Sequence, residues 1–400
     1  MEAKTLNITE DISGERPQPQ WFKTGMIIGG VMLAALLFGA ARILFVGHSV
    51  FASSNEVPWN IMVVYYAYGI SSIGLSYIAS LGLLFGMKSF DVFARRALFL
   101  ALILAVPSIT SIVLDMGNPL RAVYTIWYWS PESALAIVAM SINVYVVLIA
   151  AELYFLIKRG HEDRLVKILA IGTFLSATIA HSHLGSIFGL TTAKDLWAGP
   201  YYPLYFLLSA FTLSAALIIP VTVYTYKATG QQISEKLGQG LVATGKLLAG
   251  LIAISMIFLY WKLYSGFYAG KPEVKMLFTG AYALNFWVFE VLIGFLVPFV
   301  MLLVQPNVLS AKKLNSMAVA SVMAIVGLFI SRYDFVILGQ LIPSNSKLLS
   351  GIGSGGDYLT QLAAYTPNLT EILTGIGLFG IVWTAYLLGV RYLPLDADEK

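Results

Sequence analysis

The strongest constraint on the fold is a series of ten long apolar runs that fill most of the 400-residue chain. About 20 mostly apolar residues in a helix cross the hydrocarbon core of a bilayer. Charged residues make up 12% of the chain, whereas soluble domains carry roughly 25%, so the chain cannot cover a water-facing surface. The sequence therefore predicts an all-α, polytopic integral membrane protein with candidate spans at 23–47, 60–87, 97–115, 132–157, 165–190, 201–226, 240–264, 276–304, 314–333 and 370–392.

The segments outside these runs are too short for a second domain. We expect a core of two packed four-helix bundles plus extra helices, in a single membrane domain over 23–392 with short tails at 1–22 and 393–400. No secretory signal is expected, because the first apolar run is too long and its N-terminal flank is mixed in charge. The longest non-helical stretches are expected near 116–131, 191–200 and 334–369.

Basic residues predict the orientation of these spans. Ten spans place both termini on one side, and about two thirds of the 25 Lys and Arg residues fall on that side. By the positive-inside rule both termini are cytoplasmic, and the long stretches face outward. Those stretches hold Arg121, Trp127 and Trp197, and Tyr201 directly follows 191–200. These residues indicate either an interfacial aromatic belt or a docking surface for a partner.

Several kinds of chemistry are excluded or disfavoured. The chain has no cysteine, which removes disulfides, thiolate zinc sites and Cys-ligated iron–sulfur clusters. A net charge of +4 is modest and gives no sign of nucleic-acid binding. A bis-histidine haem needs two histidines at matching depth, and His48 is the only conceivable partner for those of the fifth run because His161 lies in a cytoplasmic loop. We therefore expect no haem.

Two glutamates stand inside apolar runs, where an unpaired charge costs at least about 2.5–3.5 kcal/mol. Glu290 is at the centre of 276–304, and Glu152 is in the cytoplasmic half of 132–157. Each either forms a structural hydrogen bond or handles protons. Together they suggest a proton path across the membrane.

A second group of polar residues is expected near the outer face. His181 and His183 are two residues apart, about 200° around a helix, so they cannot both face one ligand. Asp115, Arg121 and Glu132 flank the same zone, and Arg332 with Asp334 is expected to close the ninth run. The group indicates either a site for a small polar headgroup or ion pairs that join helix ends.

At these residues the sequence resembles a known family. Leu114-Asp115-Met116-Gly117-Asn118-Pro119 is similar to the Asp–Gly–Pro loop of polysulfide reductase/NrfD-type membrane subunits, and the longer chain looks most like the ten-helix, HybB-like branch. One departure is His181-Ser182-His183, where the family often has His-Gln-Ser-Ser, so the matching histidine is left open. Further similar segments are Pro58-Trp59, Glu132 with Glu152, Gly185-Ser186, Trp197, Phe286–Glu290, Arg332, Tyr365-Thr366-Pro367 and Glu371.

The resemblance implies a membrane subunit without a redox cofactor of its own, in a prokaryotic cell membrane. Members of this family exchange electrons between a quinone pool, menaquinone or similar, and a docked ferredoxin-like iron–sulfur subunit. That partner connects to a catalytic subunit such as a molybdopterin enzyme or a nickel–iron hydrogenase. The chain would then be a non-catalytic or quinone-reactive subunit of an oxidoreductase complex.

These expectations combine into one hypothesis for the site. His181 or His183, with Asp115 and Glu132, would contact the quinone headgroup and handle its protons, while Arg332 balances the charge. Glu290 and Glu152 would carry protons to or from the cytoplasmic side. Two alternatives stay open: a secondary transporter or ion-coupled carrier that uses the same polar residues, and a purely structural anchor.

Overall fold

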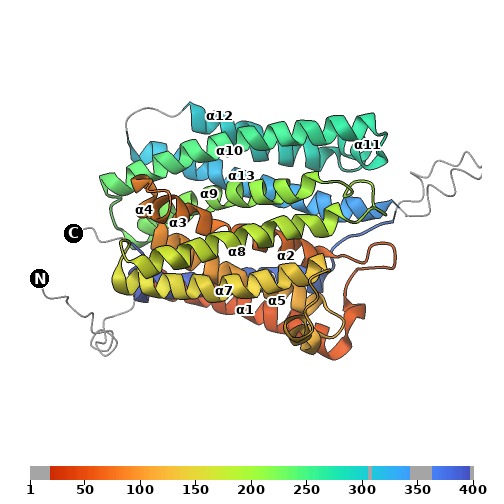
Figure 1. Ribbon diagram of the computed structural model, residues 1–400, viewed down its shortest axis with the longest axis horizontal. Coiled ribbons are helices and arrows are strands. Elements are labelled where there is room, and N and C mark those ends of the chain that lie inside the picture. The colour runs from red at the N-terminus through yellow and green to blue at the C-terminus, as the bar shows by residue number, and fades with distance from the viewer. Residues whose placement is uncertain (1–18, 305–308, 343–362, 397–400) are drawn as a thin grey trace, which may run out of the picture.

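The protein is described by a computed structural model that covers residues 19–304, 309–342 and 363–396, drawn in Figure 1. The described part contains ten helices long and apolar enough to cross a membrane, which confirms the predicted number of spans. They are α1 (Gln20–Val46), α2 (Ile61–Ser72) continued by α3 (Leu75–Leu83), α5 (Ala94–Asp115), α7 (Ala134–Arg159), α8 (Arg164–Gly189), α9 (Tyr201–Thr229), α10 (Glu235–Tyr268), the π-helical segment Asn285–Leu296 continued by α12 (Val297–Leu303), α13 (Ala311–Leu341) and α15 (Leu369–Tyr392).

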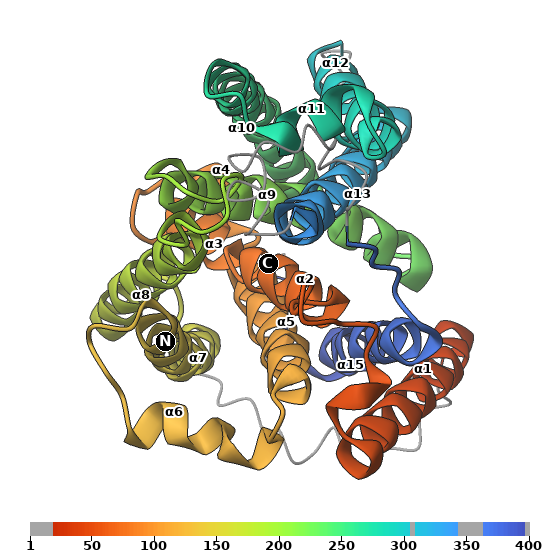
Figure 2. The same cartoon turned by 90° about the vertical axis from the view of Figure 1, so that its right-hand side faces the viewer.

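The connections carry short helices at both ends of the molecule. The described chain ends meet at one end, where the rings of Phe22 and Tyr392 are in edge contact; we call it the terminal end. The opposite end, called the loop end, holds α6 (Tyr124–Trp127) and α11 (Pro272–Thr279) and faces the viewer in Figure 2. The short elements are 3₁₀ turns at His48–Val50 and Pro119–Val123, with α4 (Lys88–Asp91), α6 (Tyr124–Trp127) and α11 (Pro272–Thr279).

The spans pack as two four-helix bundles, as expected. The first is formed by the α2–α3 span with α5, α7 and α8, and the second by α9, α10, α13 and the span made of the π-helical segment and α12. The bundles meet along α9, which packs against α8, α2 and α3. The end-on view in Figure 2 separates the second bundle, at the top, from the first.

The extra helices α1 and α15 lie side by side against the first bundle (Figure 2). Small residues allow the close approach: a Cβ added at Gly29 would lie 2.4 Å from the Thr384 hydroxyl, and one at Gly39 would lie 2.1 Å from that of Thr374. Close packing of this kind is how helices associate in lipid, where no hydrophobic effect drives them together.

The second predicted span is broken inside the bilayer. α2 ends at Ser72 and α3 begins at Leu75, and Gly74 sits so close to α9 that an added Cβ would lie 3.0 Å from the Ala210 carbonyl oxygen. The last carbonyls of a helix have no partner within it. The break therefore presents backbone oxygens, and the negative end of the α2 dipole, to the interior.

The eighth predicted span also differs from a regular helix. Its first part, Asn285–Leu296, is π-helical and is followed by Pro298 in the first turn of α12. Proline has no N–H to donate to the preceding turn, which favours the wider winding that often marks functional sites. Gly294 and Gly327 let this segment touch α13, since a Cβ added at Gly327 would lie 2.1 Å from the Gly294 Cα.

The ninth span is longer than the sequence predicts. α13 continues to Leu341 rather than ending near 333, so Arg332 and Asp334 lie inside the helix and the prediction that they close it is wrong. Lys194 holds its far end by donating to the carbonyls of Gln340 at 3.1 Å and Ile342 at 3.0 Å. Burial lowers the pKa of Lys194. Most of the expected 334–369 loop, from 343 to 362, lies outside the described residues.

Candidate functional site

Polar residues inside the bundle form two groups, of which the first lies at the loop end around Asp115. Asn60 caps the start of α2, where its Oδ1 accepts from the Met62 N–H at 2.7 Å. In this position the Asn60 Nδ2 points at Asp115, the last residue of α5, and donates a hydrogen bond to its Oδ1 at 2.7 Å. His48 brings its Nε2 to 3.8 Å from the same oxygen. We call Asp115, Asn60 and His48 the Asp115 cluster.

The Asp115 cluster is half open to its surroundings. The His48 side chain is 43% exposed and that of Asp115 is 12% exposed. A headgroup arriving at this end could therefore reach the imidazole first and the carboxylate behind it. The arrangement offers a carboxylate acceptor and an imidazole side by side, both suited to exchanging protons with a bound molecule.

A second carboxylate, Glu371 of α15, lies beside this cluster. Tyr365 accepts from the Ile61 N–H at 2.7 Å and donates to Glu371 Oε1 at 3.1 Å. Burial and the Glu371 carboxylate raise the pKa of Tyr365, so its hydroxyl stays protonated and able to donate. Glu371 also closes a capping box with Asn368 and lies close enough to Asp115 for their charges to interact.

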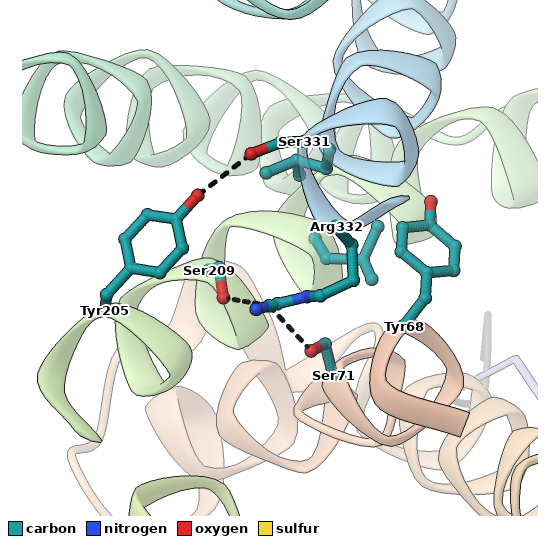
Figure 3. A pocket seen from close by; sticks show the side chains of 8 residues that line it. Tyr68, Ser71, Tyr205, Ser209, Ser331 and Arg332 are labelled. Atoms are coloured by element: carbon teal, nitrogen blue, oxygen red, sulfur yellow. Dashed lines mark hydrogen bonds between the residues drawn. The ribbon is translucent and has the colours of Figure 1, made fainter. Parts of the chain in front are cut away.

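The second group lies deeper, around Arg332. Its Nη2 donates to Ser209 Oγ at 2.7 Å and Ser71 Oγ at 3.2 Å, and its guanidinium lies 3.8 Å from the Phe206 ring centre. Figure 3 shows the serines converging on the guanidinium from α9 and α2. Arg332 is 4% exposed, and its Nη1 has no hydrogen-bond partner among the described residues.

A small cavity of about 10 Å³ adjoins the guanidinium, with Tyr68, Tyr205 and Ser331 among its lining residues. That volume is close to the space one water molecule occupies on this measure. The cavity is too small for a quinone ring. The Arg332 environment can therefore bind water or relay a proton, but as it stands it cannot hold an organic substrate.

Glu290 belongs to the same buried group. Ser331 donates to Glu290 Oε1 at 2.7 Å, and Tyr205 shares a hydrogen bond with Ser331 at 3.1 Å. Lys262 of α10 interacts electrostatically with Glu290 and with Asp334, and Asp334 accepts from Asn285 Nδ2 at 2.9 Å. Two acidic and two basic side chains therefore lie together inside the membrane. We call Arg332, Glu290, Lys262 and Asp334 the central cluster.

His181 meets the central cluster at the α2–α3 break. It is fully buried, with Nε2 2.9 Å from the Ile70 carbonyl oxygen and Nδ1 2.7 Å from that of Ala177. Tyr77 approaches the same Nδ1 at 3.3 Å. Because Ser71, the next residue after Ile70, bonds Arg332, histidine and arginine contact neighbouring positions of the broken helix.

Glu152 approaches this break from the terminal half of the membrane. It is 1% exposed and faces Thr173 and Tyr145. Tyr145 in turn donates to the Ile73 carbonyl at 2.7 Å, inside the break. Tyr145 therefore interacts electrostatically with Glu152 and hydrogen-bonds the broken helix. His181 and Arg332 contact the same helix at Ile70 and Ser71.

The remaining sequence-based candidates lie elsewhere. Glu132 is exposed before α7 and makes no hydrogen bond or ion pair within the described part of the chain, and His183 turns its Nδ1 to the Ile179 carbonyl at 3.0 Å. Arg121 and Trp127 are exposed at the loop end. The residues expected in a single outer site are thus separated. Asp115 belongs to the Asp115 cluster, and Arg332 belongs to the deeper central cluster, which His181 adjoins at the α2–α3 break.

The docking role expected of Trp197 is corrected by its burial. Trp197 is 3% exposed, and its indole N–H donates to the Phe335 carbonyl at 2.8 Å. The indole ring stacks on that of Trp59, with 4.9 Å between the ring centres. Trp197 is a core residue that packs between the helices at the loop end. Tyr201 is half-buried, with its hydroxyl donating to the Phe258 carbonyl at 3.0 Å.

The sequence did not predict that three polar residues belong to these clusters: His48, Asn60 and Lys262. Lys262 had a visible signal, since it is a charge at the edge of a long apolar run. Asn60 directly follows Pro58-Trp59 and is a typical helix cap, but its contact with Asp115 depends on two helix ends meeting in space. His48 was considered only as a haem ligand.

Fold and clusters together define a polytopic helical membrane protein with a half-open acidic site at one end and a buried, charge-balanced core. The family model for Polysulphide reductase, NrfD matches residues 49–344. The chain belongs to this family, and α1 and α15 flank the matched region.

Curated relatives cover nearly the whole chain. A selenate reductase subunit of Mesobacillus selenatarsenatis is 24% identical over 88% of this chain and 90% of its own. The Hdr-like menaquinol oxidoreductase integral membrane subunit of Archaeoglobus fulgidus is 26% identical over 86% and 87%. The probable Ni/Fe-hydrogenase 2 b-type cytochrome subunit of Escherichia coli is 25% identical over 93% and 92%.

The name of the last relative raises the question of haem in this chain. Of the four histidines, His181 is the one enclosed by the bundle, and both of its ring nitrogens lie within hydrogen-bond distance of backbone carbonyls. Iron ligation would require one of these contacts to break and a second histidine to face it. The described residues do not fit a bis-histidine haem.

Proposed function

We propose that this chain is the integral membrane subunit of a respiratory oxidoreductase complex. In this proposal it exchanges electrons between the quinone pool and a docked ferredoxin-like iron–sulfur subunit, which serves a catalytic subunit such as a molybdopterin enzyme or a nickel–iron hydrogenase. The chain itself carries neither haem nor an iron–sulfur cluster. Family membership and the similarity to the Archaeoglobus menaquinol oxidoreductase subunit support the proposal.

The quinone headgroup is assigned to the Asp115 cluster. Quinone reduction combines two electrons with two protons at the ring oxygens, so the site needs groups that hold and move protons. Asp115 would exchange a proton with one ring oxygen, His48 would hydrogen-bond the same headgroup, and Asn60 would hold the carboxylate in place. The observation that carries this assignment is a carboxylate that is fixed by Asn60, faced by His48 and still accessible.

The docking surface is assigned to the connection between α5 and α7. The exposed fractions of Trp127 and Tyr128 are 77% and 78%, and Arg121 is exposed beside them. Figure 2 shows α6 lying across the loop end between these two helices. Large aromatic side chains and arginine are the types enriched at protein interfaces, and the surface follows Asp115 directly in sequence.

The orientation follows from charge. Lys and Arg concentrate at the terminal end, so the positive-inside rule places both termini in the cytoplasm and the docking surface outside. The complex belongs in a prokaryotic cell membrane, with the iron–sulfur partner on its outer face. Quinone protons would then be exchanged near that face.

The buried polar residues supply a route for protons toward the cytoplasm. The route would pass through the α2–α3 break and would use Glu290, Arg332, His181, Tyr145 and Glu152. Broken helices inside a membrane present backbone oxygens of the kind that transporters use for ions. The role assigned to the central cluster is therefore proton transfer coupled to quinone turnover.

Purification of the tagged full chain from membranes tests the function as a whole. We expect co-isolation of an iron–sulfur subunit and a catalytic subunit, with bound quinone extractable in organic solvent. A chain that purifies alone and moves a solute across sealed vesicles would instead be a secondary transporter. If no substitution of a polar residue changed the quinone-linked activity of the complex, the chain would be a purely structural anchor.

Glu290→Gln is expected to lower the number of protons moved per electron while the complex still assembles. The amide oxygen can accept from Ser331 as the carboxylate does, so the local fold is retained, but the amide cannot take up and release a proton at working pH. Proton uptake by vesicles holding the complex, measured during turnover, reports the effect. Glu235→Gln, at an exposed position in the first turn of α10, is the control, and equal proton yields in the two variants would reduce Glu290 to a structural acceptor.

A further inference from the structure

Away from both clusters, a lipid-facing groove runs between α10, α12 and α13 at the terminal end. Two adjoining hollows of about 550 and 620 Å³ share Val242, Lys246 and Lys313 in their walls. We call them together the α10–α13 groove. Nothing in the proposed electron or proton route uses it.

The walls of the groove combine an apolar floor with positive charge. Gly245, Ala249, Gly250, Phe299, Leu302 and Leu303 line the deeper hollow. Lys246 is exposed and makes no ion pair among the residues described, while Lys313 is 5% exposed and adds a second positive charge beside it. The acid at the rim, Glu235, accepts from Gln239 at 3.1 Å. Two lysines and one glutamate line the groove, so its walls carry a formal charge of +1 beside an apolar surface.

The depth of Lys246 suits a phosphate group. The run from Leu247 to Trp261 has no charged residue and is bounded by Lys246 and Lys262. Sixteen residue steps of helix rise about 24 Å, compared with about 30 Å for the hydrocarbon core. Lys246 is thus at the boundary on the terminal side, where a lysine ammonium extends into the headgroup layer.

The floor also leaves space for a chain. A Cβ added at Gly250 would meet no atom within 4 Å, so the groove is open at that position. An acyl chain can lie against the bare helix backbone there, alongside Phe299 and Leu303. Basic pockets between spanning helices on the cytoplasmic side are typical binding places for anionic lipid headgroups.

We propose that the α10–α13 groove is a specific binding site for an anionic phospholipid. The phosphodiester contacts the exposed Lys246 ammonium, and one acyl chain fills the space over Gly250. Such a lipid joins α10 to the start of α13 and to α12, and so fastens the second bundle at its cytoplasmic end. The site does not depend on the proposed quinone chemistry.

Native mass spectrometry of the detergent-purified complex tests this site, with phosphatidylglycerol or phosphatidylcholine added at equal concentrations. We expect retention of phosphatidylglycerol, and about a fivefold weaker affinity in Lys246→Gln, the effect typical of one lysine near an anionic headgroup. Lys246→Arg should retain the lipid. Lys236→Gln, at an exposed lysine in the first turn of the same helix, should not change its affinity.

A second pair of variants tests the acyl chain. Gly250→Leu fills the open space and is expected to weaken retention, while Gly30→Leu on α1, another exposed glycine with open space around it, is expected to leave retention unchanged. Far-UV circular dichroism shows whether each variant is folded. Equal retention of both lipids, or full retention of phosphatidylglycerol by Lys246→Gln, would overturn the proposal. An uncharged isoprenoid lost from Gly250→Leu but kept by Lys246→Gln would also overturn it.

Discussion

Asp115→Asn is expected to lower quinone-linked turnover of the assembled complex about 100-fold or more, the usual effect of removing a general acid–base group. The amide oxygen can still accept from Asn60, so the ends of α2 and α5 stay joined as they are now. The substituted side chain cannot exchange a proton with the headgroup. Turnover is measured with a soluble quinone analogue, and partner integrity with an artificial dye that reacts at the catalytic subunit.

Glu132→Gln is the matched comparison for this variant. The sequence placed Glu132 and Asp115 in one site, whereas the structure leaves Glu132 exposed before α7 and Asp115 held by Asn60. We expect Glu132→Gln to keep near-normal quinone turnover. Loss of turnover in Glu132→Gln with normal rates in Asp115→Asn would reverse the assignment. Parallel loss of the dye-linked activity would mean that Asp115 acts through assembly.

The spans and their number could be predicted from sequence because the cost of exposing polar backbone to lipid leaves few possibilities. A run of 20 apolar residues has to be helical in a bilayer, and an even number of runs fixes both chain ends on one side. Glu290 was identified in the same way, since a carboxylate inside an apolar run has to be paired or functional. The structure supplies its partner, Ser331.

The grouping of the polar residues could not be predicted, because it depends on helix breaks and helix lengths that hydropathy does not record. Apolar residues follow Asp334 from Phe335 to Leu338 and the helix continues to Leu341, but the charged pair looked like a helix end. Arg332 was therefore placed near the surface. The break at Gly74 falls inside an apolar run as well, and only the packing of α2 and α3 on α9 reveals it.

Arg332→Met is expected to destabilise the folded chain by about 3–5 kcal/mol, the usual cost of removing one partner from a buried set of charges. Methionine fills a similar path through the bundle, but it leaves Glu290 and Asp334 with Lys262 as their remaining base and leaves Ser71 and Ser209 without their donor. Thermal unfolding in detergent, followed by circular dichroism, reports the loss. Arg332→Lys should lie in between, because a single ammonium lacks the planar fork that reaches both serines.

The double variant Arg332→Met/Glu290→Gln separates charge balance from packing. If the guanidinium stabilises the fold chiefly by neutralising Glu290, removing that charge recovers part of the loss, and the two changes are not additive. Additive losses would show instead that the serine contacts and the stacking on Phe206 are what Arg332 contributes. In that case the main role of Arg332 would be to pack α13 against α2 and α9. The proposed proton route would then have to reach Glu290 without passing Arg332.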